Sequence, residues 1–392
     1  MTRRHAHQGL FGGMSTATFL REHWQKKPLL VRGAFPAFRD PISPDELAGL
    51  SCEDGVESRI VREKGIRAPW EVTWGPQDPR AFAKLPERGW TLLVQEANRW
   101  VPDVALLLEP FTFLPNVRVD DVMISFAAPG GSVGPHTDSY DVFLVQGQGQ
   151  RRWKYGANPI ENPSFKKGLD LRILPRFDVA EDEVLGPGDM LYLPPGFAHH
   201  GIARTPCLTY SVGFRAPNAG EAWTSFAEWS CEQGASRRLL DDPALRPAQN
   251  PGEIPPALLS RVRTMVRSID TSDDAIHRWY ASFSTQLKPG HTLEPPRRPL
   301  GTDALLRRLV RGANIGRSEE ARWAFLPRGN QGLLLFVGGI ELPVSPAAAA
   351  LARALCASRR FDGPALAALA KGRDTRALLQ RLFALGALFE LR

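Results

Sequence analysis

Short apolar segments separated by turn residues run through the first half of the chain. These segments have the length and residue types of β-strands. Clusters of Gly, Pro, Asn and Asp separate them, a pattern typical of a β-sandwich or barrel. The predicted strands are 28–32, 58–61, 70–74, 90–94, 117–126, 141–145, 151–155, 190–193 and 208–214.

The same region also carries helical signals near its start. The segment 15–25 predicts a helix before the first strand. Ser43 followed by Pro44 predicts the start of another helix, because Ser is a favoured N-cap and Pro a favoured first helical residue. We interpret residues 1–215 as one mainly β domain with a helical entry.

Beyond residue 215 the apolar positions recur at helical spacing. The predicted helices are 221–231, 256–269 and 272–284. Pro255 and Pro256 fit the start of the second helix. The candidate N-caps of the third are Asp270, Thr271 and Ser272. Because 288–300 contains four prolines, we interpret 216–300 as a helical region that ends in a Pro-rich linker.

The last region, 301–392, mixes helices with a small apolar hairpin. This combination predicts an α+β domain of the winged-helix type. The predicted helices are 305–310, 347–357, 364–370 and 374–385, and the predicted strands are 323–326, 333–337 and 340–342.

The net charge of +7 is concentrated in this last region. Residues 301–392 hold 14 Lys and Arg against 7 Asp and Glu, which accounts for the whole excess. Such an excess can attract nucleic acid or the ribosome, and an ordinary basic surface is the alternative. Arg373, Arg376 and Arg381 are interleaved with acidic residues, which argues against a sequence-specific DNA-binding helix.

The lengths of the apolar runs and the positions of the cysteines argue against a membrane protein, a zinc finger and an Fe–S protein. No apolar run reaches the length needed to cross a bilayer, and residues 1–13 lack the apolar core of a signal peptide. Cys52, Cys207, Cys231 and Cys356 are scattered without a CxxC pair, which argues against a zinc finger or an Fe–S cluster. We expect a cytoplasmic protein that does not contact membranes.

A glycine-rich segment carries the first candidate metal ligands. Residues 130–141 read Gly-Gly-Ser-Val-Gly-Pro-His-Thr-Asp-Ser-Tyr-Asp. Because residues two apart on a strand share a face, His136 and Asp138 are predicted to point together into a barrel from one strand edge. An HxD triplet is weakly specific by itself, and a surface His–Asp pair in a turn is the alternative.

A second segment supplies another histidine. Residues 185–201 contain a Pro-Gly-Asp turn, an apolar strand and a Pro-Pro-Gly turn shortly before His199 and His200. This block brings a histidine from a distant strand to the mouth of the barrel. We interpret His199 as the third ligand. His200 faces the other way on an extended backbone, and we treat it as a neighbour that could orient a ligand.

Two histidines and one carboxylate on one face of a metal ion leave adjacent coordination positions free. This is the ligand set of non-haem Fe(II) oxygenases. The free positions admit a bidentate 2-oxo acid and dioxygen. His136, Asp138 and His199 are therefore predicted to bind Fe(II) and to be the catalytic residues.

A 2-oxo diacid also requires a cation for its far carboxylate, a role that suits arginine. Arg151, Arg152 and Lys154 lie on one predicted strand, where alternation sets Arg151 against the other two. These residues alone leave open which face points inward. Ser125 and Ser211 interrupt apolar strands, and either they hydrogen-bond the cosubstrate or they are ordinary core serines.

These motifs resemble those of the JmjC-type 2-oxoglutarate oxygenases. More narrowly, the chain is similar to the bacterial ribosomal oxygenases over nearly its whole length. The similar segments include 19–35, 134–143, 194–201 and 210–217. The resemblance implies a JmjC barrel (a double-stranded β-helix, or cupin jelly roll), a helical dimerisation region and a C-terminal winged helix. It also implies a homodimer that uses Fe(II), with 2-oxoglutarate and dioxygen as cosubstrates.

The resemblance also assigns roles to residues. In the family, an arginine fifteen positions after the first metal histidine binds 2-oxoglutarate, and here that position is Arg151. Ser125 falls where the family has a serine near the cosubstrate. The bacterial ribosomal oxygenases hydroxylate an arginine of a large-subunit ribosomal protein. For such a cation, Tyr140 and Asp141 are candidate substrate contacts, with a core tyrosine and a turn-capping aspartate as the alternatives.

Other activities stay open at this point. Related ribosomal oxygenases hydroxylate histidine, and other JmjC proteins demethylate lysine. A non-catalytic module that binds RNA or the ribosome is a further alternative, although the intact set of metal ligands argues against it.

Overall fold

The chain forms two compact units, Met1–Ala216 and Pro217–Arg392. The computed structural model describes residues 9–63, 70–234, 237, 239–243, 245–247, 249–298 and 300–391. Within these ranges no helix is both long and apolar enough to cross a membrane. The division of the second unit into a helical region and a separate C-terminal domain at residue 301 stays a prediction.

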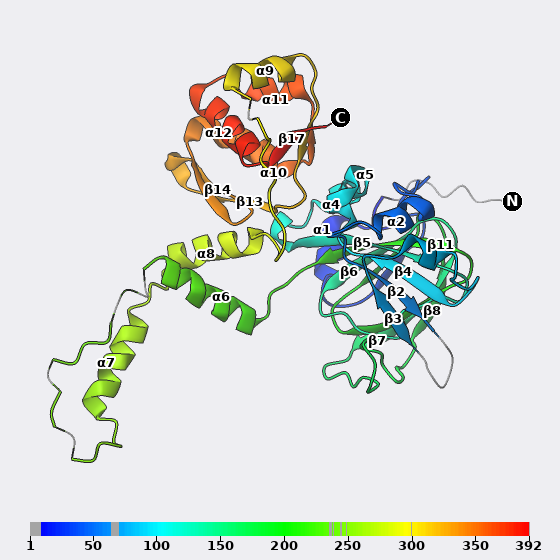
Figure 1. Ribbon diagram of the computed structural model, residues 1–392, viewed down its shortest axis with the longest axis horizontal. Helices are drawn as coiled ribbons and strands as arrows, with labels where there is room; N and C mark the ends of the chain where they lie inside the picture. Colours follow the sequence, from blue (N-terminus) through cyan, green and yellow to red (C-terminus); the bar gives the residue numbers. More distant parts are fainter. Residues whose placement is uncertain are drawn as a thin grey trace. The chain divides into compact units, whose positions relative to one another are not determined.

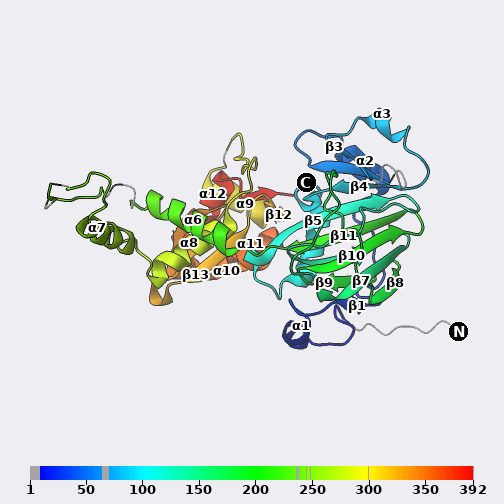
Figure 2. The ribbon, with the colours of Figure 1, turned by 90° about the horizontal axis from the view of Figure 1, so that it is seen from below.

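Unit 1 contains two antiparallel sheets (Figures 1 and 2). The larger has the order β1-β9-β6-β11-β5-β4-β2-β3, and the smaller has the order β10-β7-β8. Two facing antiparallel sheets with this crossed strand order confirm the predicted double-stranded β-helix. The strands are β1 Leu29–Val31, β2 Ser58–Arg62, β3 Glu71–Trp74, β4 Trp90–Val94, β5 Val119–Ala127, β6 Asp141–Gln146, β7 Arg151–Pro159, β8 Glu181–Leu185, β9 Met190–Leu193, β10 Phe197–Ala203 and β11 Cys207–Phe214.

Alternation along the strands separates two apolar clusters. On β6, Phe143 and Val145 belong to the large core on one face of the eight-stranded sheet. Val142 and Leu144 point the other way and pack with Trp153 of β7. The second cluster joins the two sheets, so the space between them is where residues from both can meet.

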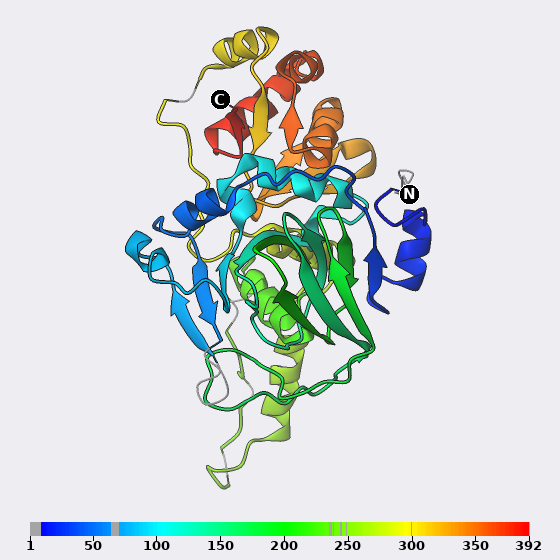
Figure 3. The same cartoon turned by 90° about the vertical axis from the view of Figure 1, so that its right-hand side faces the viewer.

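Strands from the N-terminal part of the chain form both edges of the larger sheet (blue in Figure 3). Strand β1 is at one edge, and β2 and β3 are at the other. Ser43 caps α2 in a capping box with Glu46, as its position before Pro44 predicts. The first helix ends at Glu22 rather than at residue 25, where Gln25 has a left-handed φ of 57°. The helices of unit 1 are α1 Thr16–Glu22, α2 Pro44–Leu50, α3 Pro79–Phe82, α4 Ala97–Trp100 and α5 Pro102–Ala105, with 3₁₀ turns η1 Leu106–Phe111 and η2 Asn116–Arg118.

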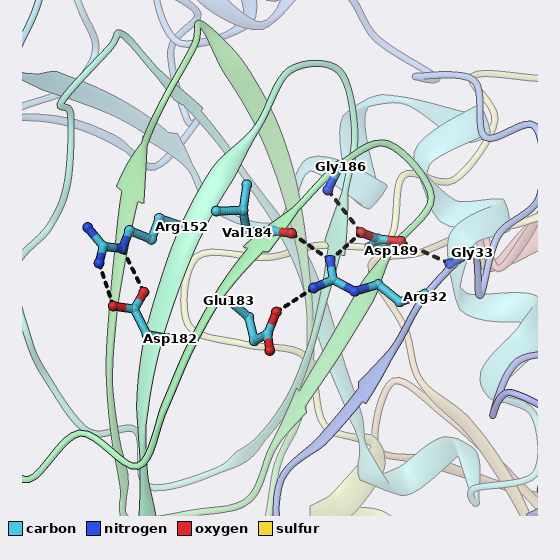
Figure 4. A network of polar contacts seen from close by, with 8 residues as sticks. All are labelled: Arg32, Gly33, Arg152, Asp182, Glu183, Val184, Gly186 and Asp189. Atoms are coloured by element: carbon cyan, nitrogen blue, oxygen red, sulfur yellow. Dashed lines mark hydrogen bonds and ion pairs between the residues drawn. The ribbon is translucent and has the colours of Figure 1, made fainter. Parts of the chain in front are cut away.

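A network of polar contacts fixes the first strand to the smaller sheet (Figure 4). Arg32, directly after β1, donates to Asp189 Oδ2 at 2.8 Å and to Glu183 Oε2 at 2.6 Å. Asp189 also accepts from the backbone N–H groups of Gly33 at 2.9 Å and Gly186 at 3.0 Å. The aspartate of the Pro-Gly-Asp turn thus joins the end of β1, strand β8 and the turn before β9.

Unit 2 combines helices with two three-stranded sheets, β16-β12-β17 and β13-β14-β15 (green to red in Figure 1). Leu305, Trp323, Leu351 and Leu382 are among the residues of its core. Ser272 is the N-cap of α8, which settles the three candidates. The helices are α6 Ala219–Glu232, α7 Pro256–Arg267, α8 Asp273–Thr285, α9 Thr302–Val310, α10 Ala349–Ala357, α11 Gly363–Leu369 and α12 Arg373–Ala384, with 3₁₀ turns η4 Gly329–Gln331 and η5 Pro346–Ala348. The strands are β12 Ile315–Arg317, β13 Trp323–Pro327, β14 Leu333–Val337, β15 Ile340–Val344, β16 Arg360–Phe361 and β17 Leu388–Glu390.

Candidate metal centre and its cavity

Three side chains from two distant segments converge between the sheets of unit 1. His136, Asp138 and His199 each offer a ligand atom, and these atoms all lie within 4.8 Å of one another. Asp138 Oδ1 is 3.9 Å from His136 Nε2, and Asp138 Oδ2 is 3.5 Å from His199 Nε2. The predicted convergence of the three residues is therefore what the structure shows.

The backbone that presents His136 and Asp138 is a loop, so the prediction that they share a strand edge is wrong. The loop is held by an isolated antiparallel bridge between His136 and His199. Their backbone groups exchange hydrogen bonds of 3.0 and 2.9 Å, and Gly196 N donates to Asp138 O at 2.8 Å. Gly134 has a φ of +80°, and a Cβ there would lie 2.5 Å from Ile173 Cδ1. Glycine at position 134 thus allows the loop to take a left-handed backbone conformation and to pack closely against Ile173.

Hydrogen bonds fix how both histidines are protonated. His136 Nδ1 lies 2.9 Å from Gly134 O, and His199 Nδ1 lies 3.0 Å from Phe197 O. Because a carbonyl oxygen only accepts, each Nδ1 carries a proton, and each Nε2 faces Asp138 as the atom that can bind a metal ion. Burial lowers the pKa of His199 to about 4, so this imidazole is neutral near pH 7. Metal binding requires that form.

The donor set fits a divalent transition metal. Two imidazoles and one carboxylate suit iron, whereas magnesium and calcium prefer oxygen donors throughout. His136, Asp138 and His199 would hold such an ion, and all three line one cavity of about 510 Å³. A metal centre that opens onto a cavity of this size is suited to catalysis rather than to a purely structural role.

Arg151 provides a buried positive charge in the same cavity. Its side chain is on β7, and the residue is only 3% exposed. Nη1 donates to Ser125 Oγ at 2.9 Å and to Thr209 Oγ1 at 3.1 Å, while Nε has no hydrogen-bond partner among the described residues. Burial lowers the pKa of Arg151, although a guanidinium stays protonated in proteins. A buried cation bonded only to hydroxyl groups has the chemistry to bind an anion.

Strand alternation decides between the three cations of β7. Arg151 faces the cavity, and Arg152 is exposed on the other side. There Arg152 forms a bidentate ion pair with Asp182 of β8, at 2.6 and 2.5 Å (Figure 4). Lys154 shares the outward face with Arg152. The inward residue is thus the one that the family resemblance selects.

The two serines lie at different levels of the cavity. Ser125 on β5 and Ser211 on β11 both line it, but only Ser125 is bonded to Arg151. Sequence reasoning missed Thr209, which bonds Arg151 and donates to Gln146 Oε1 at 3.2 Å. Because Thr209 is two positions before Ser211 on one strand, the alternation of strand faces could have identified it.

Tyr140 and Asp141, the two candidate substrate contacts, point in different directions: one lines the cavity and the other does not. Tyr140 lines the cavity and is 38% exposed. Asp141 is fully buried on the opposite face of β6, where it accepts from Tyr192 Oη at 2.6 Å and from Gln25 Nε2 at 2.9 Å. The interpretation of Asp141 as a substrate contact is therefore wrong, because its position in β6 directs it into the core with Phe143.

His200 does not share the cavity with His199. It follows His199 on β10 and lies opposite Lys154 of β7, so it faces outward as alternation predicts. Its Nε2 is buried without a hydrogen-bond partner in the part of the chain that the structure describes. No contact shows it orienting a metal ligand.

Comparison with known proteins tests the family. The family model of the JmjC domain matches residues 106–222, and that of the ROXA-like winged helix matches residues 266–389. The chain is 40% identical over 294 residues to the ribosomal protein uL16 3-hydroxylase of Escherichia coli K12, which covers 75% of this chain and 78% of that protein. The chain belongs to the JmjC ribosomal oxygenases. The second match also confirms the predicted winged helix in this oxygenase.

Solved structures of a relative extend the similarity to the whole fold. YcfD, a ribosomal oxygenase from Escherichia coli, has been solved with cobalt and 2-oxoglutarate. It is 34% identical to this ribosomal oxygenase, with a TM-score of 0.79 over 97% of this chain and 99% of that one. A probable ribosomal oxygenase of Haemophilus influenzae is 39% identical over 234 residues, which are 59% of this chain and 57% of that protein.

Proposed function

We propose that this ribosomal oxygenase is an Fe(II)- and 2-oxoglutarate-dependent hydroxylase of an arginine in ribosomal protein uL16. The observation that supports this most strongly is the pairing, in one cavity, of the metal ligands with the buried cation Arg151. The similarity to a uL16 3-hydroxylase over three quarters of the chain supports the substrate. The choice of arginine rests on the resemblance described above.

Each residue of the site has a physical task in this proposal. His136, Asp138 and His199 would hold Fe(II). Bound iron with 2-oxoglutarate and dioxygen supplies the oxidation: one oxygen atom enters a substrate C–H bond, and the 2-oxo acid leaves as succinate and CO₂. Arg151 binds the far carboxylate of 2-oxoglutarate, held in position by Ser125 and by Thr209, which was not anticipated from the sequence.

The apolar part of the cavity keeps water from the reacting atoms. Val142, Leu144 and Trp153 line the cavity between the sheets and are buried. Excluding water strengthens the attraction between Arg151 and a carboxylate. Ser211 and Tyr140 line the same cavity, and we assign Ser211 to the cosubstrate and Tyr140 to the substrate.

The test is the mass of uL16 from ribosomes treated with the purified enzyme, Fe(II) and 2-oxoglutarate. We expect a gain of one oxygen atom on a single arginine, together with an equal amount of succinate. His136→Ala, which removes a metal ligand, should give neither product. An unmodified uL16 treated with the active wild-type enzyme would show that the substrate is another protein.

Two related activities give different products in the same assay. Relatives named bifunctional lysine-specific demethylase and histidyl-hydroxylase are 28% identical over 49% of this chain. A histidine hydroxylase would add oxygen to a histidine, and a demethylase would release formaldehyde from methyl-lysine. A non-catalytic module that binds RNA or the ribosome would form no succinate at all.

Assembly and location follow from the same proposal. A ribosomal protein substrate places the reaction in the cytoplasm. We further propose that the chain is a homodimer, joined through the helices of residues 216–288. The basic excess of residues 301–392 would add a weak, salt-dependent contact with ribosomal RNA.

A further inference from the structure

Unit 2 has a cavity of its own, which no residue of the metal site lines. It has a volume of about 670 Å³ and is lined by residues of helices α9 and α12, strand β17 and the Pro-rich linker (Figure 1). A cavity of this size is typical of a site for a small molecule or for one group of a larger ligand. Most of the side chains that line it are apolar, among them Leu300, Leu305, Phe383, Leu388 and Phe389.

Phe389 offers this cavity part of an aromatic ring. A Cβ at Gly316 would lie 2.9 Å from Phe389 Cζ, so the ring lies closely over the backbone of β12. The residue is nevertheless 40% exposed. The ring is thus supported by the protein on one part and open on another. Such a ring is suited to stacking on a flat group, such as a nucleic-acid base.

A row of side chains on α12 leads to the cavity. Arg376, Gln380 and Ala384 are four residues apart, so they lie one above another on the same face of the helix. Gln380 and Ala384 line the cavity. At 1.5 Å per residue, Arg376 lies about 6 Å from Gln380 along the helix. Arg373, three residues before Arg376, continues the row away from the cavity.

The two arginines of this row are available to a ligand. Arg373 and Arg376 are exposed, and neither has an ion pair in the part of the chain that the structure describes. Arg308, which lines the cavity, is instead paired with Glu390 at 2.7 Å. The positive charge that remains uncompensated therefore lies along α12, beside the cavity.

The acidic residues near the row leave this positive excess in place. Asp374 accepts from Ser345 Oγ at 2.5 Å, on the flank of α12 next to η5. Glu294 lines the cavity, and so does Arg298, a cation of equal charge. An apolar cavity beside free arginines suits a ligand that combines a flat apolar group with negative charge.

We propose that the cavity and the arginine row of α12 form a binding site for single-stranded RNA. One base stacks on Phe389 in the cavity, and the phosphates that follow lie against Arg376 and Arg373. Unpaired bases are free to enter such a cavity, whereas the bases of a double helix are stacked inside it. An apolar side chain of a protein would fill the cavity but leave the arginines unused. The inference rests on the ribosomal RNA contact proposed above, and it adds the site and the kind of RNA.

The experiment measures how tightly the full-length protein binds a fluorescent uridine oligomer of about 12 nucleotides at several salt concentrations. The double variant Arg373→Gln with Arg376→Gln should bind more weakly. Its slope of log affinity against log salt should be smaller by about 0.7 for each lost phosphate contact. Phe389→Ala should bind roughly 5- to 150-fold more weakly with an unchanged slope, because stacking on phenylalanine involves no charge.

Each variant has a matched control in the same protein. Arg39→Gln with Arg353→Gln removes two exposed arginines that neither line the cavity nor belong to α12. Ile340→Ala removes an apolar side chain that is 39% exposed on β15. Both controls should bind the oligomer like the wild type and with the same salt slope.

The outcomes separate this inference from the proposed hydroxylation. If Phe389→Ala binds the oligomer as tightly as Ile340→Ala, no base occupies the cavity and the inference fails. It also fails if the α12 double variant binds like its control, and this variant provides the test if Phe389→Ala does not fold. If Phe389→Ala loses binding to purified uL16 but not to RNA, the cavity holds a protein side chain instead.

Hydroxylation of a free uL16 peptide should be the same in all these variants, because none of them changes a residue of the metal site. A wild type that binds the oligomer but leaves the uL16 arginine unmodified contradicts the proposed hydroxylation and leaves the RNA site intact. A wild type that hydroxylates uL16 but does not bind the oligomer at low salt contradicts the RNA site alone.

Discussion

Burial of the Arg151 charge is unfavourable for the stability of the free protein but favourable for binding an anion. A guanidinium that is 3% exposed and bonded only to hydroxyl groups destabilises the free protein, because burying a charge without a counterion is unfavourable. The arrangement becomes favourable when a carboxylate binds. The site is therefore organised for a cosubstrate rather than for the stability of the fold.

We predict that Arg151→Met is at least as stable as the wild type without ligand but does not respond to 2-oxoglutarate. At 100 times its dissociation constant, a ligand stabilises the native state by about 2.7 kcal/mol, and only the wild type should show this increase. The measurement is urea unfolding with and without 2-oxoglutarate and Mn(II). Arg152→Met, at the exposed cation next along β7, should respond like the wild type. A response in Arg151→Met would place the cosubstrate elsewhere.

Asp141 should make the stability of the fold depend on pH. Burial raises its pKa above the ordinary value of 3.8, against the opposing hydrogen bonds from Tyr192 and Gln25 and the charge of Arg118. The folded chain thus holds this proton more tightly than the unfolded chain does. By linkage, the stabilising contribution of Asp141 to the free energy of unfolding is present at low pH and is lost as the pH rises through its folded-state pKa.

The comparison with Asp141→Asn isolates this effect, because the variant cannot titrate at this position. The free energy of unfolding of the wild type minus that of Asp141→Asn should fall as the pH is raised from about 4 to about 7. Urea unfolding at several pH values measures the difference. A difference that grows with pH would mean that the ion pair with Arg118, 3.4 Å away, outweighs burial.

At the scale of elements, the contacts of Asp189 fix the start of the barrel. This carboxylate has a side chain 14% exposed and accepts from Arg32, Gly33 and Gly186. The pair of Arg152 with Asp182 has similar geometry but side chains 47% and 35% exposed. Exposed pairs are screened by water and contribute little.

We therefore predict that Asp189→Ala destabilises unit 1 by about 2 to 3 kcal/mol, since it leaves two backbone N–H groups without their acceptor and removes one of the acceptors of Arg32. Asp182→Ala should lower stability by less than about 1 kcal/mol. Denaturant midpoints of the two variants give the comparison. Equal losses would show that the turn before β9 is held by its backbone alone.

Strands with an apolar face could be predicted from the sequence, and polar edge strands could not. The predicted strands 90–94 and 190–193 match β4 and β9 to the residue. Strand β8 was missed because Glu181–Leu185 is mostly polar and exposed, as befits the edge of a sheet. Strand β10 was missed because its two histidines and Gly201 interrupt its apolar run.

The site was predictable in its chemistry but not in its backbone. Residue types and spacing identified three side chains that the fold brings together, yet the loop of His136 and Asp138 is held by a bridge to His199, a tertiary contact that local pattern cannot reveal.

At the scale of the whole molecule, the apolar side of helix α7 is left exposed by the residues that the structure describes. The helix has no buried residue in the described chain, and Leu259, Val262 and Val266 are 51%, 39% and 60% exposed. Their spacing of three and four places them on one face of the helix. A stripe of this kind on a folded chain is typical of a surface that another molecule covers. The dimer implied by the family resemblance supplies a second copy of the same stripe.

We predict that the wild type sediments with twice the mass of one chain and that Val262→Asp with Val266→Asp converts it to a monomer. Two carboxylates on the apolar face of α7 would have to be buried without partners, which strongly opposes association. Val310→Asp is the control, because Val310 is 66% exposed on α9, away from that stripe. If the double variant remains a dimer, the interface lies elsewhere and the apolar side of α7 faces another partner.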